Sequence, residues 1–252
     1  MQRPPILVPK PALIAAWEWQ GRGTPPAVIG MNEYWMPESG KKEFEDKVLK
    51  VLTTLGLAKD GKMTPDFREI LTVLTHGGLR YTGWANDVAS GEDGGILVAL
   101  HGNQAVRALR TAEDVRLDVV PQERALESLV DALPDMRPVA LNPIKIPKSE
   151  FTPDKPRLSE NYRFDMPTRY EAPDPLDRLR ALLKAKRAGA HQFYVHKGTA
   201  RSSPVTIVDI MGEGRLLSFM TDAPGQETQL NFLPGTRQNI MQTMYSTAQA
   251  LR

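Results

Sequence analysis

Hydrophobic and polar positions follow the same succession twice along this chain. Residues 67–134 and 176–252 each combine apolar residues spaced three or four apart, typical of a helix, with short alternating stretches, typical of strands. In one such stretch Thr206 and Val208 fall on one face of a strand, while Ile207 falls on the other. Each half therefore predicts a helix, three or four short strands and a closing helix.

Two signals mark the start of these halves. Thr64-Pro65-Asp66 combines a capping hydroxyl, a proline in the first helical position and an acidic residue in the first turn, and Asp174-Pro175 repeats the first two features. Strands are expected over 79–84, 96–101, 106–110 and 115–119, and again near 191–197, 204–211, 215–221 and 228–233. The closing helices are expected over 122–133 and 235–251.

A direct alignment of the two halves supports a duplication. Residues 98–111 align with residues 208–221, which places Gly102 opposite Gly212, 110 residues further on, with apolar residues opposite apolar ones. The sequence therefore predicts an α+β fold. In it, quasi-twofold duplicated helix–β-meander–helix halves form one central antiparallel sheet, with helices packed on one side and the connector or another element on the other.

We expect residues 1–252 to form a single domain. Its N-terminal half covers about 12–134, its C-terminal half covers about 175–252, and residues 135–174 connect them. Nine of the chain's 21 prolines lie between positions 134 and 175, which favours an extended connector over an independently folded unit. At the N-terminus, the pattern predicts a short helix, a turn, a strand over 27–31 and a helix over 40–55.

Composition removes several classes of protein. The net charge is only +2, and the absence of cysteine excludes a disulfide scaffold, a thiolate metal site and a cysteine nucleophile. Prolines interrupt the apolar residues near the N-terminus, so no signal peptide is expected, and no stretch is long and apolar enough for membrane insertion. These features predict a cytoplasmic protein.

No arrangement of residues predicts a reaction. His191 and His196 lie five apart in an expected strand, so they point to opposite faces and cannot share a metal. His76 and His101 are expected to be isolated from each other, and all four histidines to lie at the surface or rim. The chain has no phosphate-binding loop, dinucleotide fingerprint or nucleophile elbow. We therefore expect no catalytic residues, no cofactor and no metal.

The C-terminal half is the more apolar of the two. Leu217 aligns with Arg107, and Phe232 aligns with Val119. This difference indicates either a larger core or an apolar surface that docks a partner. On the second interpretation, the residues expected to face the partner are Phe193, Leu217, Phe219, Gln229, Asn231, Gln238 and Met241.

Several stretches, in order along the chain, resemble the EspG family, the chaperones associated with ESX (type VII) secretion in actinobacteria. They are Ala27-Val-Ile-Gly-Met-Asn-Glu-Tyr-Trp35, Leu55-Gly-Leu-Ala-Lys-Asp-Gly-Lys-Met-Thr-Pro-Asp66, Arg80-Tyr-Thr-Gly-Trp84, Gly189-Ala-His-Gln-Phe-Tyr-Val195 and Phe232-Leu-Pro-Gly-Thr-Arg-Gln-Asn-Ile240. The last, at the expected final strand-to-helix turn, is the most specific. The resemblance implies a central antiparallel sheet with helical bundles.

The resemblance also implies a function. A chaperone of this kind binds the hydrophobic tip of a PE–PPE heterodimer, or a related small helical secretion substrate, keeps it soluble and delivers it to the secretion system. A nucleic-acid or small-ligand binding module without catalysis is the alternative, because the isoelectric point is near 8.8 and basic residues gather over 178–187. Binding of nucleic acid would weaken steeply with salt, and on the chaperone interpretation none is expected.

Overall fold

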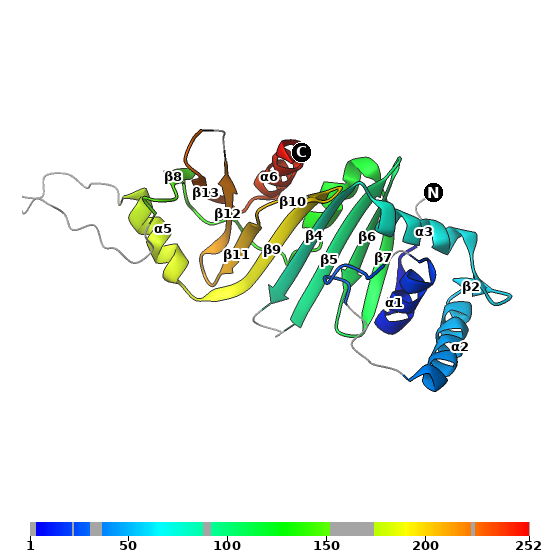
Figure 1. The fold of residues 1–252 in the computed structure, drawn as a ribbon. Coiled ribbons are helices and arrows are strands. Elements are labelled where there is room, and N and C mark those ends of the chain that lie inside the picture. Colours follow the sequence, from blue (N-terminus) through cyan, green and yellow to red (C-terminus); the bar gives the residue numbers. More distant parts are fainter. Residues whose placement is uncertain are drawn as a thin grey trace, which may run out of the picture.

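The computed structural model describes residues 4–21, 23–30, 37–87, 92–151, 174–222 and 225–251. Within them, eleven strands form one antiparallel sheet, and a two-residue hairpin, β2–β3, lies apart from it (Figure 1). The strands are β1 (Ile6–Pro9), β2 (Ala58–Lys59), β3 (Lys62–Met63), β4 (Leu79–Asp87), β5 (Glu92–His101), β6 (Gln104–Arg110), β7 (Asp114–Pro121), β8 (Ile144–Pro147), β9 (Arg187–Lys197), β10 (Ala200–Arg201), β11 (Val205–Ile210), β12 (Gly214–Thr221) and β13 (Gln229–Pro234).

Helices begin and end both halves. They are α1 (Lys10–Trp19), α2 (Glu38–Thr54), α3 (Pro65–His76), a 3₁₀ turn (Gln122–Arg124), α4 (Ala125–Val130), α5 (Pro175–Lys184) and α6 (Arg237–Ala250). The predicted caps of α3 and α5 are confirmed, because the Thr64 hydroxyl accepts from the amide of Phe67 at 3.3 Å and the Asp174 carboxylate accepts from that of Leu176 at 2.9 Å. No helix in the described part of the chain is both long and apolar enough to cross a membrane.

The strand order makes the duplication visible. The sheet runs β1-β7-β6-β5-β4-β9-β11-β12-β13-β8, with β10 paired to β9, so each half occupies one side of the central β4–β9 pair. In this pair Gly83 lies opposite Phe193, 110 residues later in the chain, the same offset that relates Gly102 to Gly212 in the two tight turns. The predicted quasi-twofold arrangement is confirmed, and its axis passes near the Gly83–Phe193 pair.

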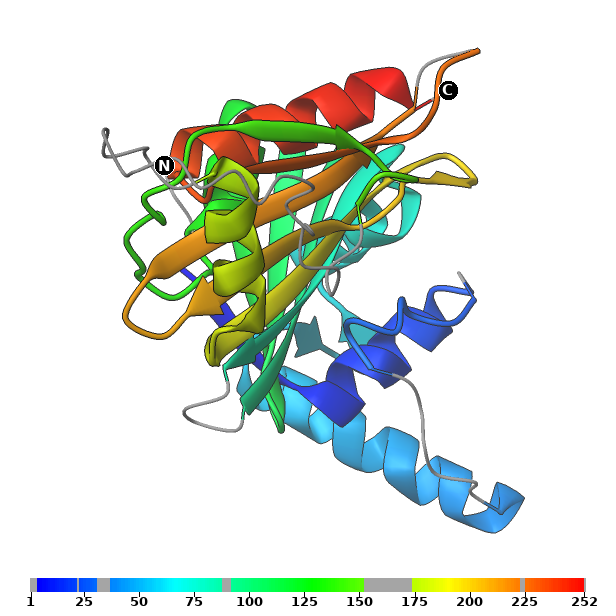
Figure 2. The ribbon, with the colours of Figure 1, turned by 90° about the vertical axis from the view of Figure 1, so that its left-hand side faces the viewer.

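Helices cover both faces of the sheet, so the expectation of helices on one side only is wrong. On one face, the helix-covered face, α4 and α6 pack against alternate residues that include Val98, Phe193, Val195 and Leu217. On the opposite face, α1 and α3 pack over one end of the sheet, with α2 against α1, and α5 packs over the other end (Figures 1 and 2). The amphipathic spacing of α5 explains its position, because Leu179 and Leu182 face the sheet and are buried.

Two segments differ from the sequence-based expectation. Residues 27–29 form a turn instead of a strand. This turn crosses β5 so closely that a Cβ atom on Gly95 would lie 1.7 Å from the carbonyl oxygen of Val28. The proline-rich connector contributes strand β8, which pairs with β13 at the edge of the sheet. Residues 31–36 and 152–173, which include the rest of the expected N-terminal strand and most of the connector, lie outside the described residues.

Candidate functional site

The two faces of the central strands differ sharply in exposure. On β9, Phe193 and Val195 are completely buried on the helix-covered face, whereas Gln192 is exposed and Tyr194 half-buried on the other. On β4, Trp84 is 39% exposed on that same second face. On the face that carries Trp84, none of the described helices packs over β4 and β9. This area lies between α1–α3 and α5 (Figure 1).

We call this surface the open face and define it by alternate residues of β4 and β9. Its members are Arg80, Thr82, Trp84, Gln192, Tyr194 and His196. It lies where the two halves meet, because β4 belongs to the first half and β9 to the second. An exposed tryptophan on a sheet is typical of a partner-binding surface, since aromatic side chains supply a large contact area at a low cost in conformational entropy.

Arginine side chains hold the aromatic rings of the open face in place. The guanidinium group of Arg201 stacks 3.9 Å from the centre of the Tyr194 ring, and that of Arg110 lies 5.3 Å from the centre of the Trp84 ring. Arg110 also donates from Nε to the carbonyl oxygen of Val28 at 2.9 Å. These cation–π contacts leave the rings partly exposed and oriented, which suits docking.

His196 is a titratable group at one end of this surface, opposite Arg80. Its Nε2 lies 2.9 Å from the hydroxyl oxygen of Thr82. Burial, followed by the neighbouring charges of Arg80 and Arg201, lowers the pKa of His196 from its ordinary value of 6.5. The open face thus combines apolar area, basic groups and hydrogen-bonding groups. Such a surface can bind another molecule.

Two of the residues expected to face a partner belong to the core. Phe193 and Leu217 are both completely buried beneath α4 and α6. A side chain with no exposed surface cannot contact a partner unless the core opens. For these two residues the larger-core interpretation is right, and their placement on a docking surface is corrected.

Of the other five expected residues, three lie on the helix-covered face of β12 and β13, and two lie on α6. Phe219 and Met241 are half-buried and pack against the core cluster beneath α6. Gln229 and Asn231 lie on β13, where the Asn231 amide donates to the Thr221 hydroxyl at 3.0 Å, and Gln238 is exposed on α6. The role of these five residues in binding stays a prediction.

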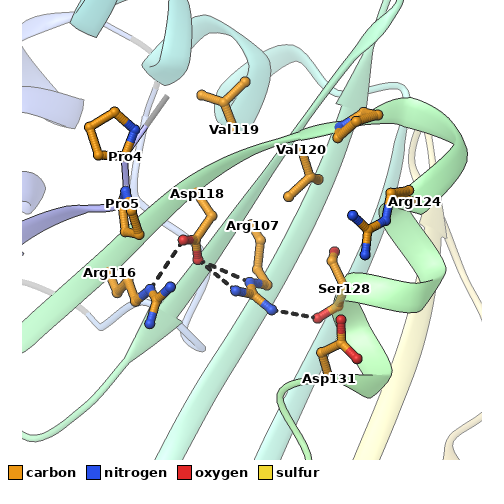
Figure 3. A pocket seen from close by; sticks show the side chains of 11 residues that line it. Pro4, Pro5, Arg107, Arg116, Asp118, Val119, Val120, Arg124, Ser128 and Asp131 are labelled. Atoms are coloured by element: carbon orange, nitrogen blue, oxygen red, sulfur yellow. Dashed lines mark hydrogen bonds and ion pairs between the residues drawn. The ribbon is translucent and has the colours of Figure 1, made fainter. Parts of the chain in front are cut away.

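A hollow of about 420 Å³ lies on the helix-covered face beside α4. Figure 3 shows Arg107, Arg116 and Asp118 directed toward one another within it. Arg107 donates from Nε and Nη2 to Asp118 Oδ2 at 3.1 and 2.8 Å, and Arg116 donates to Oδ1 at 3.1 Å. Arg107 also donates to the carbonyl oxygen of Ser128 at 2.9 Å. Because this network joins β6, β7 and α4, we interpret its role as structural.

The histidines differ from expectation in two ways. His191 is buried, with Nε2 3.2 Å from Asp209 Oδ2, and Asp209 also accepts from Arg215 at 2.6 and 2.7 Å. The rings of His76 and His101 lie 6.3 Å apart and are therefore not isolated from each other. The expectation that His191 and His196 point to opposite faces is confirmed by the strand register.

Sequence reasoning missed the open face as a site, although it found both strands that form it. Trp84 on β4 and Tyr194 on β9 occupy positions that alternate with apolar ones, where polar residues are expected. An aromatic residue in such a position was the available signal.

Comparisons with known proteins agree with this fold. The sequence matches the EspG family over residues 9–245. No curated protein sequence matches this chain. A solved structure of the type VII secretion system chaperone EspG5 of Mycobacterium tuberculosis, in complex with a PE25-PPE41 dimer, is similar with a TM-score of 0.67. The alignment covers 99% of this chain and 97% of that chain at 16% identity, so it shows a shared fold.

Proposed function

We propose, since this chain belongs to the EspG family, that it is a non-catalytic chaperone which binds a PE–PPE substrate of a type VII secretion system in the cytoplasm. The family match supports the class of function. EspG5, whose fold this chain shares, is a chaperone of type VII secretion described in complex with a PE25-PPE41 dimer. The chain acts as one domain, with its docking surface where the two halves meet.

The observation that carries the proposal is the open face. The central strands bury Tyr81, Phe193 and Val195 on one face and leave Trp84, Gln192 and Tyr194 exposed or half-buried on the other, between the helices at the two ends of the sheet. A client that exposes an apolar helical tip would aggregate in water, and a partly apolar sheet surface removes that tip from solvent. A rigid sheet presents such a surface without the entropic cost of ordering loops.

The nucleic-acid alternative is less well supported. The basic residues of α5 are engaged within the fold, since Arg178 pairs with Glu213 and Arg180 pairs with Asp177. The basic run that motivated the alternative therefore leaves fewer free cations for phosphates.

The experiment is capture of a PE–PPE pair by the tagged full-length chain from cytosol of its own host, identified by mass spectrometry. The double variant Trp84→Ala with Tyr194→Ala should lose capture, because truncating an aromatic anchor at the centre of an interface costs about 2 kcal/mol or more. Circular dichroism should show that the variant is still folded, since neither side chain belongs to the fully buried core.

A second double variant, Gln238→Ala with Met241→Ala, tests the surface expected from the sequence. Retained capture by this variant, with loss in the open-face variant, supports the open face. The reverse result would place the client on the helix-covered face beside α6. Recovery of no PE–PPE pair by the wild-type chain would refute the chaperone proposal itself.

A further inference from the structure

Three basic side chains lie side by side at one end of the open face. The strand register places Arg80 of β4 opposite His196 of β9, and His196 opposite Arg201 of β10. Residues directly opposite each other in antiparallel strands point to the same face, with Cβ atoms about 5 Å apart. We call this set the basic row.

The basic row has no acidic counterpart among the described residues. Two arginines elsewhere in the protein are paired, Arg107 with Asp118 and Arg215 with Asp209. Within the described part of the chain, no ion pair joins Arg80 or Arg201 to a carboxylate. Arg80 and Arg201 flank His196, and their charges help to disfavour its protonated form. An anionic partner would supply the counter-charge that this position lacks.

We propose that the basic row selects a client whose docking tip carries carboxylate groups beside its apolar residues, an inference that rests on the proposed function. The apolar contact and the basic groups that this client would need both come from β4, β9 and β10. Trp84 and Tyr194 offer the apolar contact, and Arg201 stacks on Tyr194, so an apolar group on that ring lies next to a guanidinium. A purely apolar tip would bury these cations without a counter-charge, which is costly.

His196 gives the selection a dependence on pH. From the described elements beside it, the groups that face it are Arg80 and Thr82 of β4 and Arg201 of β10. In the free protein, burial and the two arginines disfavour its charged form. A docked carboxylate favours that form and raises the pKa of His196, so binding takes up a proton. The affinity for the client therefore rises as the pH falls through the pKa that His196 has in the complex. It levels off below the pKa that His196 has in the free protein.

The test measures the affinity of the purified chain for the PE–PPE pair recovered in the capture experiment. For the double variant Arg80→Gln with Arg201→Gln, we expect affinity to fall about tenfold or more at low salt and to lose most of its salt dependence. The matched control is Arg116→Gln with Arg124→Gln, which removes the same charge from the helix-covered face and should bind like wild type. His196→Gln should abolish the gain in affinity that wild type shows when the pH is lowered.

The reciprocal change is made in the client. Replacing the carboxylates of its docking tip by amides should weaken binding to the wild-type chain by a similar factor and add little to the loss in the arginine double variant. Affinity of the arginine double variant equal to wild type, or an equal loss in the control variant, would overturn the acidic-tip inference while leaving the chaperone proposal intact. Failure of the wild-type chain to capture any PE–PPE pair would overturn both.

Discussion

Gly83, at the centre of the sheet, is the residue whose replacement tests the packing at the quasi-twofold axis most directly. Its counterpart in the second half is Phe193, which lies opposite it in the β4–β9 pair. A Cβ atom added to Gly83 would lie 2.3 and 2.4 Å from two carbons of the Phe193 ring. One half therefore supplies a ring and the other supplies the space for it.

The expected cost of Gly83→Ala follows from these distances. Ordinary contact begins near 3.4 Å, so the ring or the strand must move by about 1 Å. Phe193 is completely buried, and a close-packed interior has no free space to receive such a shift. Overpacking of this kind costs about 1–3 kcal/mol, which lowers the unfolding temperature of a chain this long by roughly 4–8 °C at the middle of that range.

Urea denaturation followed by tryptophan fluorescence and circular dichroism measures this change. The control is Gly94→Ala in the neighbouring strand, where the added Cβ would meet its nearest atom at 3.6 Å, an ordinary contact. Gly94→Ala should leave stability unchanged or raise it slightly, because alanine restricts the unfolded chain. In a Phe193→Leu background, Gly83→Ala should cost markedly less than in wild type, because the ring carbons that it meets are gone. Equal stability of Gly83→Ala and wild type, or an undiminished cost in the Phe193→Leu background, would refute the reasoning.

Two further predictions concern ion pairs. Asp209→Asn should destabilise the fold by about 3–5 kcal/mol at neutral pH, because it leaves Arg215 buried without its counter-charge. Burial raises the pKa of Asp209, but the hydrogen bonds from Arg215 and His191 and the charge of Arg215 outweigh this and hold it below 3.8. The contribution of ionised Asp209 to the free energy of unfolding is therefore complete above its unfolded-state pKa, and it is lost as the pH falls through the lower folded-state pKa. In urea unfolding, the cost of Asp209→Asn should therefore become smaller in acid. Arg107→Gln should cost about 2–3 kcal/mol by the same assay, because it breaks the largely buried pair with Asp118. Arg124→Gln, which removes an exposed pair on the surface, should leave the midpoint unchanged, and equal losses in the two arginine variants would contradict this assignment.

Local signals in the sequence were sufficient for the elements and for the duplication. Capping residues, proline positions and the two hydrophobic periods are properties of short stretches, so they predicted the first helix of each half and the strands of the two meanders. The aligned tight turns gave the 110-residue offset that recurs across the β4–β9 pair. The turn over residues 27–29 was missed because its conformation depends on packing against Gly95, which is distant in the chain.

The candidate site depended on information that no single strand contains. The alternation of polar and apolar residues divides a strand into two faces, but it does not show which face a helix from a distant part of the chain will cover. Phe193 and Tyr194 are both aromatic neighbours in β9, and only the position of α6 buries the first and leaves the second accessible. The basic row likewise exists only once β4, β9 and β10 are paired.

The sequence by itself therefore determined the two-fold repetition, the element types and the family resemblance, because each is written in local patterns or their recurrence. The tertiary structure decided that helices cover both ends of one face and leave its centre open, that Phe193 and Leu217 are core, and that three basic residues meet without an acidic partner among the described residues. These outcomes arise from contacts between segments far apart in the chain, whose free energy depends on the whole packing arrangement.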